Sequence, residues 1–524
     1  MNNTSALQCF DRPALKTQLE EHTFDLAVIG GGITGAGIAR DAAMRGLKVA
    51  LLEAQDFASG TSSKSSKMIH GGLRYLLSGE LQVMKESVAE RTAVHNIAPH
   101  LAEKSHFILI ARSWAESLKL RVALSIYEYF GRVAKQDRHV KWSVAELQQK
   151  EPHFNTEGVY CALVYTEYLT DDARLTLATL RSATEAGAVI ANYYRVDSIT
   201  KQGELTTLHA VSQLPEEQSS ITLNAKMVVN AAGPWVDQIC QQENPAQAAR
   251  LALSRGIHVV VPREKLPINH TVVMYAADKR TIFAVPKGDT TYLGTTDEFY
   301  PKHEYWPAVY QRDVEYLFEA CRPYFPSNPL SSEDVVAVWS GVRPLVGSMD
   351  QKATEISRKD EIWVGSLGVL SIAGGKLSAY RAMAERVVDK VIVLGAFNAL
   401  PCRTANTPLP GGIQSHTTSN NALPKRLTPR YGFEAATICD MGGDLAAEVN
   451  FAVLIEGAVR LEDYWVRRSS RAWFDLDAGM SCLAPAAAIM AQQLGWSKTR
   501  QQQEIEHCLK IHQNSLQNIT TKMR

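Results

Sequence analysis

The sequence predicts an α/β protein in which a Rossmann-like nucleotide-binding domain is interleaved with an antiparallel-sheet substrate domain and followed by a C-terminal helical domain. Three observations carry this prediction. Residues 24–53 pass from an apolar run to helical spacing and back to an apolar run, the pattern of a βαβ unit. Residues 250–345 hold short β-branched runs bounded by turn residues, and residues 430–515 have mostly helical spacing.

Changes in composition along the chain give the expected boundaries. Residues 401–429 are rich in Pro, Gly, Ser, Thr and Asn, which is typical of a linker. The expected parts are an N-terminal tail at 1–20, the nucleotide-binding domain interleaved with the substrate domain at 21–400 (substrate part mainly 90–160 and 250–345), the linker, and a helical cap or accessory domain at 430–524.

Composition and charge exclude several classes of protein. The chain has 524 residues, 45% of them hydrophobic, which is enough for more than one domain with large cores. Lys+Arg and Asp+Glu balance at 55 each, so no global field favours nucleic acid, and any anion site must be local. The eight cysteines form no CxxC pair, which argues against a disulfide framework or a metal site. From the first twenty residues and the longest apolar run we expect neither a signal peptide nor a membrane-spanning segment.

A glycine fingerprint opens the first βαβ unit. Gly30, Gly32 and Gly35 match GxGxxG: the first allows the tight turn, the second lets the backbone approach a pyrophosphate, and the third lets helix and strand pack closely. Glu53 follows the second strand, where a carboxylate can bind a ribose hydroxyl. The pattern predicts dinucleotide binding and leaves FAD and NAD as alternatives.

The stretch TSSKSSKMIHGGLRYL at 61–76 favours FAD. A flavin needs many short donors along its pyrophosphate, ribityl chain and ring edge, whereas an NAD domain needs no such loop after its second strand. A solvated surface loop is the competing interpretation, and Met68 and Ile69 argue against it. The predicted flavin contacts in this loop are Ser59, Thr61, Ser62, Ser63, Gly71 and Gly72.

Residues 30–76 resemble the signature of FAD-dependent glycerol-3-phosphate dehydrogenases, the aerobic, quinone-linked enzymes of the D-amino-acid-oxidase-like flavoproteins. Further stretches match in order across about 21–395: NAAGPWVD, SRGIHVVVP, LGTTD, WSGVRPLV and SIAGGKLSAYRAMAE. The resemblance implies oxidation of sn-glycerol 3-phosphate to dihydroxyacetone phosphate by hydride transfer from C2 to FAD, with electrons passed to a membrane quinone. It also implies flavin contacts at Gly233, Gly375, Lys376 and Leu377.

The implied reaction needs a phosphate site and a base. Arg74, Arg343 and Lys376 can supply the local positive charge, with Tyr75 beside Arg74. A structural ion pair is the alternative for Arg343, and a solvated first-turn lysine for Lys376. His258 is the candidate base, although a lone histidine in an apolar strand is more often a core residue. Thr295 and Asp297, two residues apart at an expected strand end, are candidates to orient the base or bind a substrate hydroxyl.

Residues 112–135 predict a basic amphipathic helix. Such a helix can lie in a membrane interface, although a buried packing helix has the same pattern. With the quinone implied above, we expect a cytoplasmic protein bound peripherally to the inner face of the cytoplasmic membrane; a homodimer is left open. The alternatives are a related FAD-dependent oxidase that uses oxygen, acting on glycerol 3-phosphate or an amino or 2-hydroxy acid, and a catalytically silent FAD-binding protein.

Overall fold

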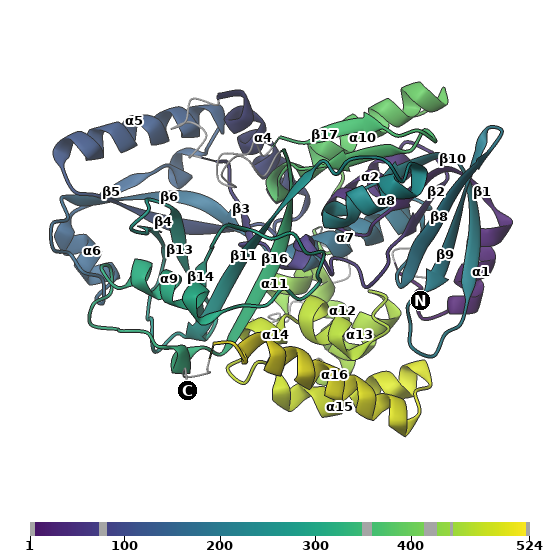
Figure 1. Ribbon diagram of the computed structural model, residues 1–524. Coiled ribbons are helices and arrows are strands. Elements are labelled where there is room, and N and C mark those ends of the chain that lie inside the picture. The colour runs from purple at the N-terminus through teal and green to yellow at the C-terminus, as the bar shows by residue number, and fades with distance from the viewer. Residues whose placement is uncertain (1–5, 73–80, 348–358, 413–426, 441–443, 520–524) are drawn as a thin grey trace.

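Two large sheets organise the chain, as the computed structural model shows (Figure 1). The structure describes residues 6–72, 81–347, 359–412, 427–440 and 444–519. In Figure 1 the sheets stand at opposite sides of the molecule, and the C-terminal helices lie along its lower edge. This is the predicted architecture, with segments of the two domains alternating along the chain.

The first sheet forms the nucleotide-binding domain. Its path is β17-β18-β10-β1-β2-β7, with β8 and β9 joined through β10. The strands β1, β2, β7, β10 and β18 pair in parallel, while β9 and β17 run antiparallel to their neighbours. The strands are β1 (Thr23–Ile29), β2 (Val49–Leu52), β7 (Val189–Ala191), β8 (Tyr194–Gln202), β9 (Leu205–Ser212), β10 (Ser220–Asn230), β17 (Glu361–Val364) and β18 (Leu370–Ala373).

The predicted βαβ unit is β1, α2 (Ile33–Met44) and β2. All four residues of β2 are buried, because α2 and its neighbours cover one face of the sheet. Helix α2 packs between α7 (Asp172–Glu185) and α10 (Tyr380–Gly395). A parallel strand covered in this way needs a continuous apolar run, which is why the pattern in the sequence was so clear.

The second sheet forms the substrate domain. It follows the path β15-β11-β14-β13-β12-β4-β6-β3, with β16 paired to β11 and β5 to β6. Its pairs are antiparallel except β12 with β4. The strands are β3 (Met68–Ile69), β4 (Glu103–Ala111), β5 (Val140–Trp142), β6 (Cys161–Leu169), β11 (Leu251–Pro262), β12 (Thr271–Tyr275), β13 (Thr281–Lys287), β14 (Thr290–Gly294), β15 (Glu298–Phe299) and β16 (Ala337–Val346). Strand β6 lies just beyond the expected segment 90–160.

The region expected to be an N-terminal tail includes a helix, α1 (Arg12–Glu21). The side chain of Asp11 accepts a hydrogen bond from Ala14 N at 3.2 Å and so caps the helix, and a proline occupies its first turn. Leu15 and Leu19 are buried in the same core as residues of β1 and β10. The expectation of a tail was therefore wrong for these residues, because an N-cap and two apolar positions one turn apart suffice to dock a short helix.

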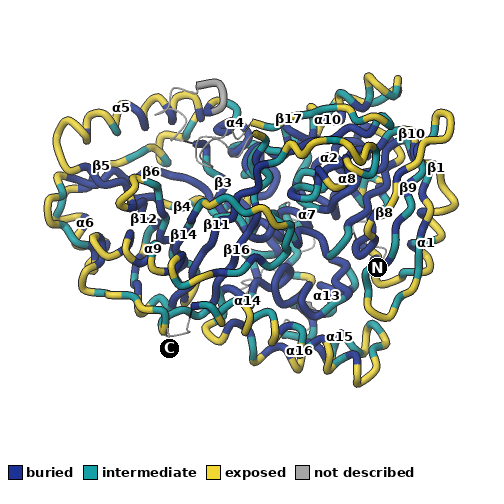
Figure 2. Tube along the Cα trace, viewed as in Figure 1, coloured by how far each residue is buried: buried dark blue, intermediate teal, exposed yellow. Residues whose placement is uncertain are grey.

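Five further helices flank the sheets: α4 (Leu81–Ile97), α5 (Trp114–Phe130), α6 (Val144–Lys150), α8 (Val236–Glu243) and α9 (Gln311–Cys321). Figure 2 shows that α5 lies at the outer rim with exposed positions along it. In the described part of the chain, no helix is both long and apolar enough to cross a membrane.

The C-terminal region is helical, as predicted. It packs against the substrate sheet, where Trp473 shares a core with Tyr292 and Trp339. Its helices are α11 (Thr428–Tyr431), α12 (Ala435–Asp440), α13 (Leu445–Leu454), the π-helix η7 (Asp463–Arg468), α14 (Arg471–Phe474), α15 (Met480–Leu494) and α16 (Lys498–Leu516).

Candidate active site

A cavity of about 750 Å³ lies where the carboxyl ends of β1, β2 and β10 meet β16 of the second sheet. This is the edge of a parallel sheet at which nucleotide ligands bind. The structure brings many of the predicted residues to its wall: Gly30, Gly32, Glu53, Ser59, Thr61, Ser62, Gly233, Thr295, Arg343, Gly375, Lys376 and Leu377.

The glycine turn has the geometry that the fingerprint predicts. Gly30 has φ of 110°, and a Cβ there would lie 2.6 Å from Ala231 O. A Cβ at Gly35 would lie 1.9 Å from Gly30 O, so Gly35 serves the packing of α2 on the turn rather than the cavity wall. Gly32 is the N-cap residue of α2, whose N-terminus therefore faces the cavity as a site for anionic oxygens.

Glu53 stands at the end of β2 and is held by backbone amides. Gly31 N donates to its Oε2 at 2.6 Å, and Gln55 N donates to its Oε1 at 2.9 Å. Burial raises the pKa of the Glu53 carboxyl, and the two amide donors act against that shift. The side chain is thereby fixed on the cavity wall, in the position expected for a ribose contact.

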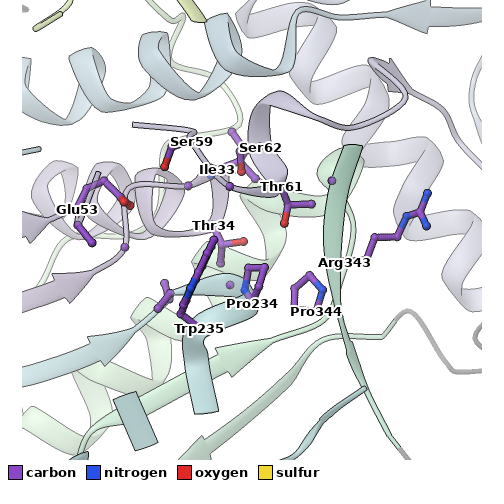
Figure 3. Close-up of a pocket in the computed structure, with 18 of the residues that line it drawn as sticks. Ile33, Thr34, Glu53, Ser59, Thr61, Ser62, Pro234, Trp235, Arg343 and Pro344 are labelled. Atoms are coloured by element: carbon purple, nitrogen blue, oxygen red, sulfur yellow. Dashed lines mark hydrogen bonds between the residues drawn. The ribbon is translucent and has the colours of Figure 1, made fainter. Parts of the chain in front are cut away.

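Some of the residues of the hydroxyl-rich loop that we predicted to contact the flavin line the cavity. Ser59, Thr61 and Ser62 line the wall, and Ile33 N donates to Ser62 Oγ at 2.9 Å, which joins the loop to the start of α2. In Figure 3 these side chains lie close together between Glu53 and Arg343. Ser63 is outside the lining, because its side chain turns into the buried interior.

Gly71 and Gly72 are also outside the cavity lining of the described residues. Gly71 N donates to Glu167 Oε2 at 3.2 Å, and a Cβ at Gly71 would lie 2.2 Å from Tyr127 Oη. The close approach that requires a glycine here is thus to Tyr127 of α5. Arg74 and Tyr75 lie outside the described residues.

Arg343 forms the cationic end of the cavity. Its Nη1 pairs with Asp297 Oδ1 at 3.0 Å, and its Nη2 donates to Thr295 Oγ1 at 3.0 Å. A Cβ at Gly256 would lie 2.1 Å from Nη2, so the glycine of β11 makes room for the guanidinium. Arg343 is therefore both ion-paired and part of the cavity wall; Figure 3 shows it at the opposite end from Glu53.

Thr295 and Asp297 lie in the connection between β14 and β15 rather than on one face of a strand. Thr295 lines the cavity, whereas Asp297 is outside the lining and acts through Arg343. Asp297 also accepts a hydrogen bond from Ser254 Oγ. The carboxylate therefore orients the guanidinium of Arg343, whereas from the sequence we expected it to orient the base or to bind a substrate hydroxyl.

Lys376 follows a turn that glycine makes possible. Gly374 and Gly375 have φ of 79° and 82°, and Lys376 precedes the short 3₁₀ helix η5 (Leu377–Ala379), which leads into α10. Gly375, Lys376 and Leu377 all line the cavity. The lysine thus adds positive charge beside the N-terminus of a helical segment.

His258 is placed behind the wall of the cavity. It lies on β11, is 1% exposed, and is outside the lining. Its ring stacks on Trp339 with centroids 4.8 Å apart, and its Nε2 lies 2.9 Å from Ser66 Oγ. Burial lowers the pKa of His258 well below its usual range, and the charges of Arg343 and Lys67 lower it further. The lowered pKa favours the neutral form of the imidazole.

The wall of the cavity fits FAD. A glycine turn and helix N-terminus suit a pyrophosphate, Glu53 suits a ribose hydroxyl, and the hydroxyls of Ser59, Thr61 and Ser62 continue the polar wall toward Arg343. The room for the pyrophosphate is narrow, since a Cβ at Gly32 would already lie 3.1 Å from Ser62 Oγ.

Comparisons with known proteins support the interpretation that this cavity binds FAD. The family described as FAD dependent oxidoreductase matches residues 25–381, and the C-terminal domain of alpha-glycerophosphate oxidase matches residues 402–501. The aerobic glycerol-3-phosphate dehydrogenase of Staphylococcus aureus is 35% identical over 549 residues, which cover 97% of this chain and 98% of that protein. The chain belongs to the aerobic glycerol-3-phosphate dehydrogenase family. The predicted family and its dependence on FAD are thus confirmed.

Solved structures show the same fold. The glycerol-3-phosphate dehydrogenase from Bacillus halodurans, complexed with FAD, superposes with a TM-score of 0.81 at 29% identity and covers 99% of this chain and 100% of that one. Glycine oxidase from Geobacillus kaustophilus shares the fold with a TM-score of 0.55 at 21% identity, over 74% of this chain and 98% of that one. The family fold therefore extends through the C-terminal helical region.

Several cavity residues of this family member escaped the sequence analysis. Lys64, Ser66 and His70 line the wall and lie within the stretch at 61–76, so the loop that was singled out contained them. Lys64 Nζ donates to Ser59 O at 2.7 Å and to Tyr305 O, and burial lowers the pKa of its ammonium to about 7.

Two aromatic residues on the wall were also missed. Trp235 and Tyr305 stack with ring centroids 4.3 Å apart, and both line the cavity. Trp235 lies in the short 3₁₀ helix η3 (Gly233–Trp235) after β10, beside the predicted Gly233. Tyr305 comes from the irregular segment between β15 and α9, for which no motif in the sequence gave a signal.

Proposed function

We propose that the protein oxidises sn-glycerol 3-phosphate to dihydroxyacetone phosphate with FAD bound in the cavity. The observation that carries this proposal is the oriented guanidinium of Arg343 on the cavity wall, at the end away from Glu53. The guanidinium is held by Asp297, Thr295 and the carbonyl oxygen of Thr296, and it keeps a positive charge in a fixed place on the cavity wall, where it can attract a phosphate. Because the chain carries no net charge, such a local cation is what a dianionic substrate requires.

We assign a separate role in the reaction to each of these residues. Arg343 and Lys376 bind the phosphate, and Arg74 and Tyr75 are proposed to join them. Asp297 positions Arg343, and Thr295 binds a substrate oxygen. FAD, when bound, accepts the hydride from C2 of the substrate. His258 is the proposed acceptor of the hydroxyl proton, since a neutral imidazole can take it up.

An anaerobic titration tests the proposal. The purified holoprotein is mixed with sn-glycerol 3-phosphate in the absence of any acceptor, and the absorbance of oxidised flavin is followed. We expect complete bleaching with one equivalent of dihydroxyacetone phosphate formed per flavin. Flavin that stays oxidised with glycerol 3-phosphate but is bleached by an amino acid or a 2-hydroxy acid would contradict the proposal.

We propose a membrane quinone as the acceptor of the electrons. The second candidate is oxygen, which is favoured by the match of residues 402–501 to the C-terminal domain of alpha-glycerophosphate oxidase. The reduced protein is mixed with either a soluble quinone analogue or oxygen, and the rate of flavin reoxidation is measured. Faster reoxidation by the quinone supports the dehydrogenase, and equal or faster reoxidation by oxygen supports the oxidase.

We propose that α5 attaches the protein to the inner face of the cytoplasmic membrane. Trp114 is 65% exposed and Tyr129 is 77% exposed, and Leu118, Val122 and Ile126 between them are exposed as well. Figure 2 shows α5, with exposed positions along it, at the rim of the molecule. The exposed cations around it are Arg112, Lys119, Arg121, Arg132 and Lys135.

This combination of an apolar face and surrounding cations suits the headgroup region of a bilayer that contains anionic lipid. A helix buried in domain packing, the competing interpretation, would have covered these apolar side chains. Leu124 and Tyr127 on the opposite side of α5 are buried, so the helix has a separate face for the protein. An attachment of this kind brings the enzyme to a quinone dissolved in the membrane.

A further inference from the structure

His258 and Ser66 form a hydrogen-bonded pair at the wall of the cavity. His258 is buried and outside the lining, whereas Ser66 is half-buried and lines the cavity. The 2.9 Å between His258 Nε2 and Ser66 Oγ is within the range of a direct hydrogen bond. The hydroxyl of Ser66 thus connects a buried base to the space in which substrate binds.

The surrounding structure holds this pair in a fixed orientation. Tyr292 Oη donates to Ser66 O at 3.1 Å, and Trp339 Nε1 donates to Ser65 O at 3.1 Å. The ring of His258 lies nearly parallel to that of Trp339, at an angle of 12°. Among the described residues, His258 Nδ1 is buried and has no hydrogen-bond partner. The polar contact of this imidazole is therefore with Ser66.

The charges around His258 link its basicity to the substrate. Arg343 on β16 and Lys67 in the hydroxyl-rich loop both act on the imidazole, and Tyr292 on β14 faces it edge-on. Lys67 Nζ pairs with Asp172 Oδ1 at 2.6 Å, which offsets part of the positive charge of the lysine. A phosphate bound by Arg343 would offset the positive charge of that guanidinium. The proton affinity of His258 would therefore rise when substrate is present. The base is then strongest when it is needed.

We propose that Ser66 is a catalytic residue that relays the C2 hydroxyl proton of the substrate to Nε2 of His258. The inference rests on the proposed oxidation of glycerol 3-phosphate. As the C2 hydrogen leaves as hydride to the flavin, the C2 hydroxyl proton moves to Ser66 Oγ, and the proton of Ser66 Oγ moves to Nε2.

The electrons and protons in these transfers balance. The substrate loses two electrons and becomes the ketone, the flavin gains them, Ser66 is restored, and His258 becomes an imidazolium that later returns its proton to solvent. The relay requires that Nδ1 carries the hydrogen of the resting imidazole, so that Nε2 accepts the hydrogen bond from Ser66.

Three variants of the holoprotein test the relay. Ser66→Ala removes the hydroxyl, Ser66→Thr keeps it, and Ser340→Ala is the matched control, because Ser340 is a buried serine outside the cavity lining whose hydroxyl has no partner among the described residues. The rate constant of anaerobic flavin reduction and the dissociation constant of dihydroxyacetone phosphate are measured for each.

We expect Ser66→Ala to slow flavin reduction by about 10²-fold or more with little change in product binding, since a positioned proton acceptor contributes about that much. Ser66→Thr should recover most of the rate, and Ser340→Ala should behave as the native protein. As a readout independent of turnover, nitrogen NMR of labelled histidine should show the Nδ1–H tautomer of His258 in the resting protein.

The results that would contradict the relay differ from the result that would contradict the proposed function. If Ser66→Ala reduces its flavin at the native rate, the relay is wrong and another lining group, such as His70, takes the proton. If Ser66→Thr is as slow as Ser66→Ala, or if product binding weakens in proportion to the rate, Ser66 has only a structural role. An Nε2–H tautomer would also overturn the relay. If the native protein itself is not reduced by glycerol 3-phosphate, the proposed function fails instead.

Discussion

Arg468 donates two hydrogen bonds to the carboxylate of Asp56, one of them from Nη2 to Oδ1 at 2.9 Å. Asp56 lies three residues after Glu53, and both members of the pair are buried. Arg467 of the same π-helix donates to Asp56 as well, at 2.5 Å. The C-terminal region therefore holds the loop that brings Ser59, Thr61 and Ser62 to the cavity wall.

Replacing Arg468 by glutamine should weaken FAD binding as well as stability. The change leaves the buried carboxylate of Asp56 with fewer charged partners, and breaking a buried ion pair typically costs about 3–5 kcal/mol. The free energy of unfolding and the dissociation constant of FAD are the quantities to measure. The control is Arg312→Gln, whose exposed pair with Glu298 should contribute under about 1 kcal/mol. Unchanged FAD affinity in Arg468→Gln would contradict this link.

Gly32→Val should abolish flavin retention while the protein still folds. Its Cβ would lie 3.1 Å from Ser62 Oγ, so the side chain intrudes on the cavity rather than on the backbone. Gly35→Val is expected to disrupt folding instead, because its Cβ would lie 1.9 Å from a carbonyl oxygen. Flavin content and thermal melting of both variants distinguish these effects. A yellow Gly32→Val protein would mean that the pyrophosphate lies elsewhere.

Lys64 should give stability a dependence on pH. Burial lowers the pKa of its ammonium to about 7 in the folded protein, against an ordinary value of 10.5. Between these two values the unfolded chain binds one more proton, so this lysine makes the free energy of unfolding rise with pH, by up to about 1.4 kcal/mol per pH unit. Below pH 7 the full cost of burying the charge remains.

The measurement is denaturant unfolding of protein stripped of FAD at several pH values above 7. Lys64→Met should remove the rise with pH and be the more stable protein at neutral pH. Lys302→Met, which changes an exposed lysine, should keep the native slope. The same slope in Lys64→Met as in the native protein would show that Lys64 is not the group responsible.

Leu118→Glu together with Val122→Glu should release the protein from anionic vesicles while flavin reduction by substrate stays unchanged. Both side chains are exposed on α5, so the change removes apolar contact with lipid and adds repulsive charge. Cosedimentation with vesicles at low salt measures the effect. Leu124→Glu is unsuitable for this purpose, because Leu124 is 0% exposed and its replacement would destabilise the fold. If the double variant still binds vesicles as the native protein does, α5 is not the attachment.

The parts of the site that could be predicted depend on residues close together in the sequence. The glycine turn and Glu53 obey constraints that operate within one βαβ unit, and the hydroxyls of Ser59 to Ser62 follow soon after it. The cofactor contacts predicted at these positions lie on the cavity wall. Alternation along β11 could not tell whether His258 faces the cavity or lies behind it. The partner of Gly71 comes from α5, and the partner of Trp235 comes from an irregular segment, so neither contact could be predicted without the tertiary structure.

Helix α5 shows a further limit of periodicity. Its apolar residues occupy two faces, one with Leu124 and Tyr127 toward the core and one with Trp114 and Leu118 toward solvent. Spacing alone identified an amphipathic basic helix, but it could not say which apolar residues the protein would cover. That choice depends on β6 and α4, which pack against the inner face.

We expect Arg343 and Lys376 to bind the phosphate of the substrate beside the flavin. The most direct test compares glycerol 3-phosphate with glycerol in anaerobic reduction of the native holoprotein, expressed as kcat/KM. Because each lost charge-assisted hydrogen bond costs about 1.5–3 kcal/mol, we expect kcat/KM for glycerol to be lower by several orders of magnitude. Equal values of kcat/KM for the two compounds would contradict it.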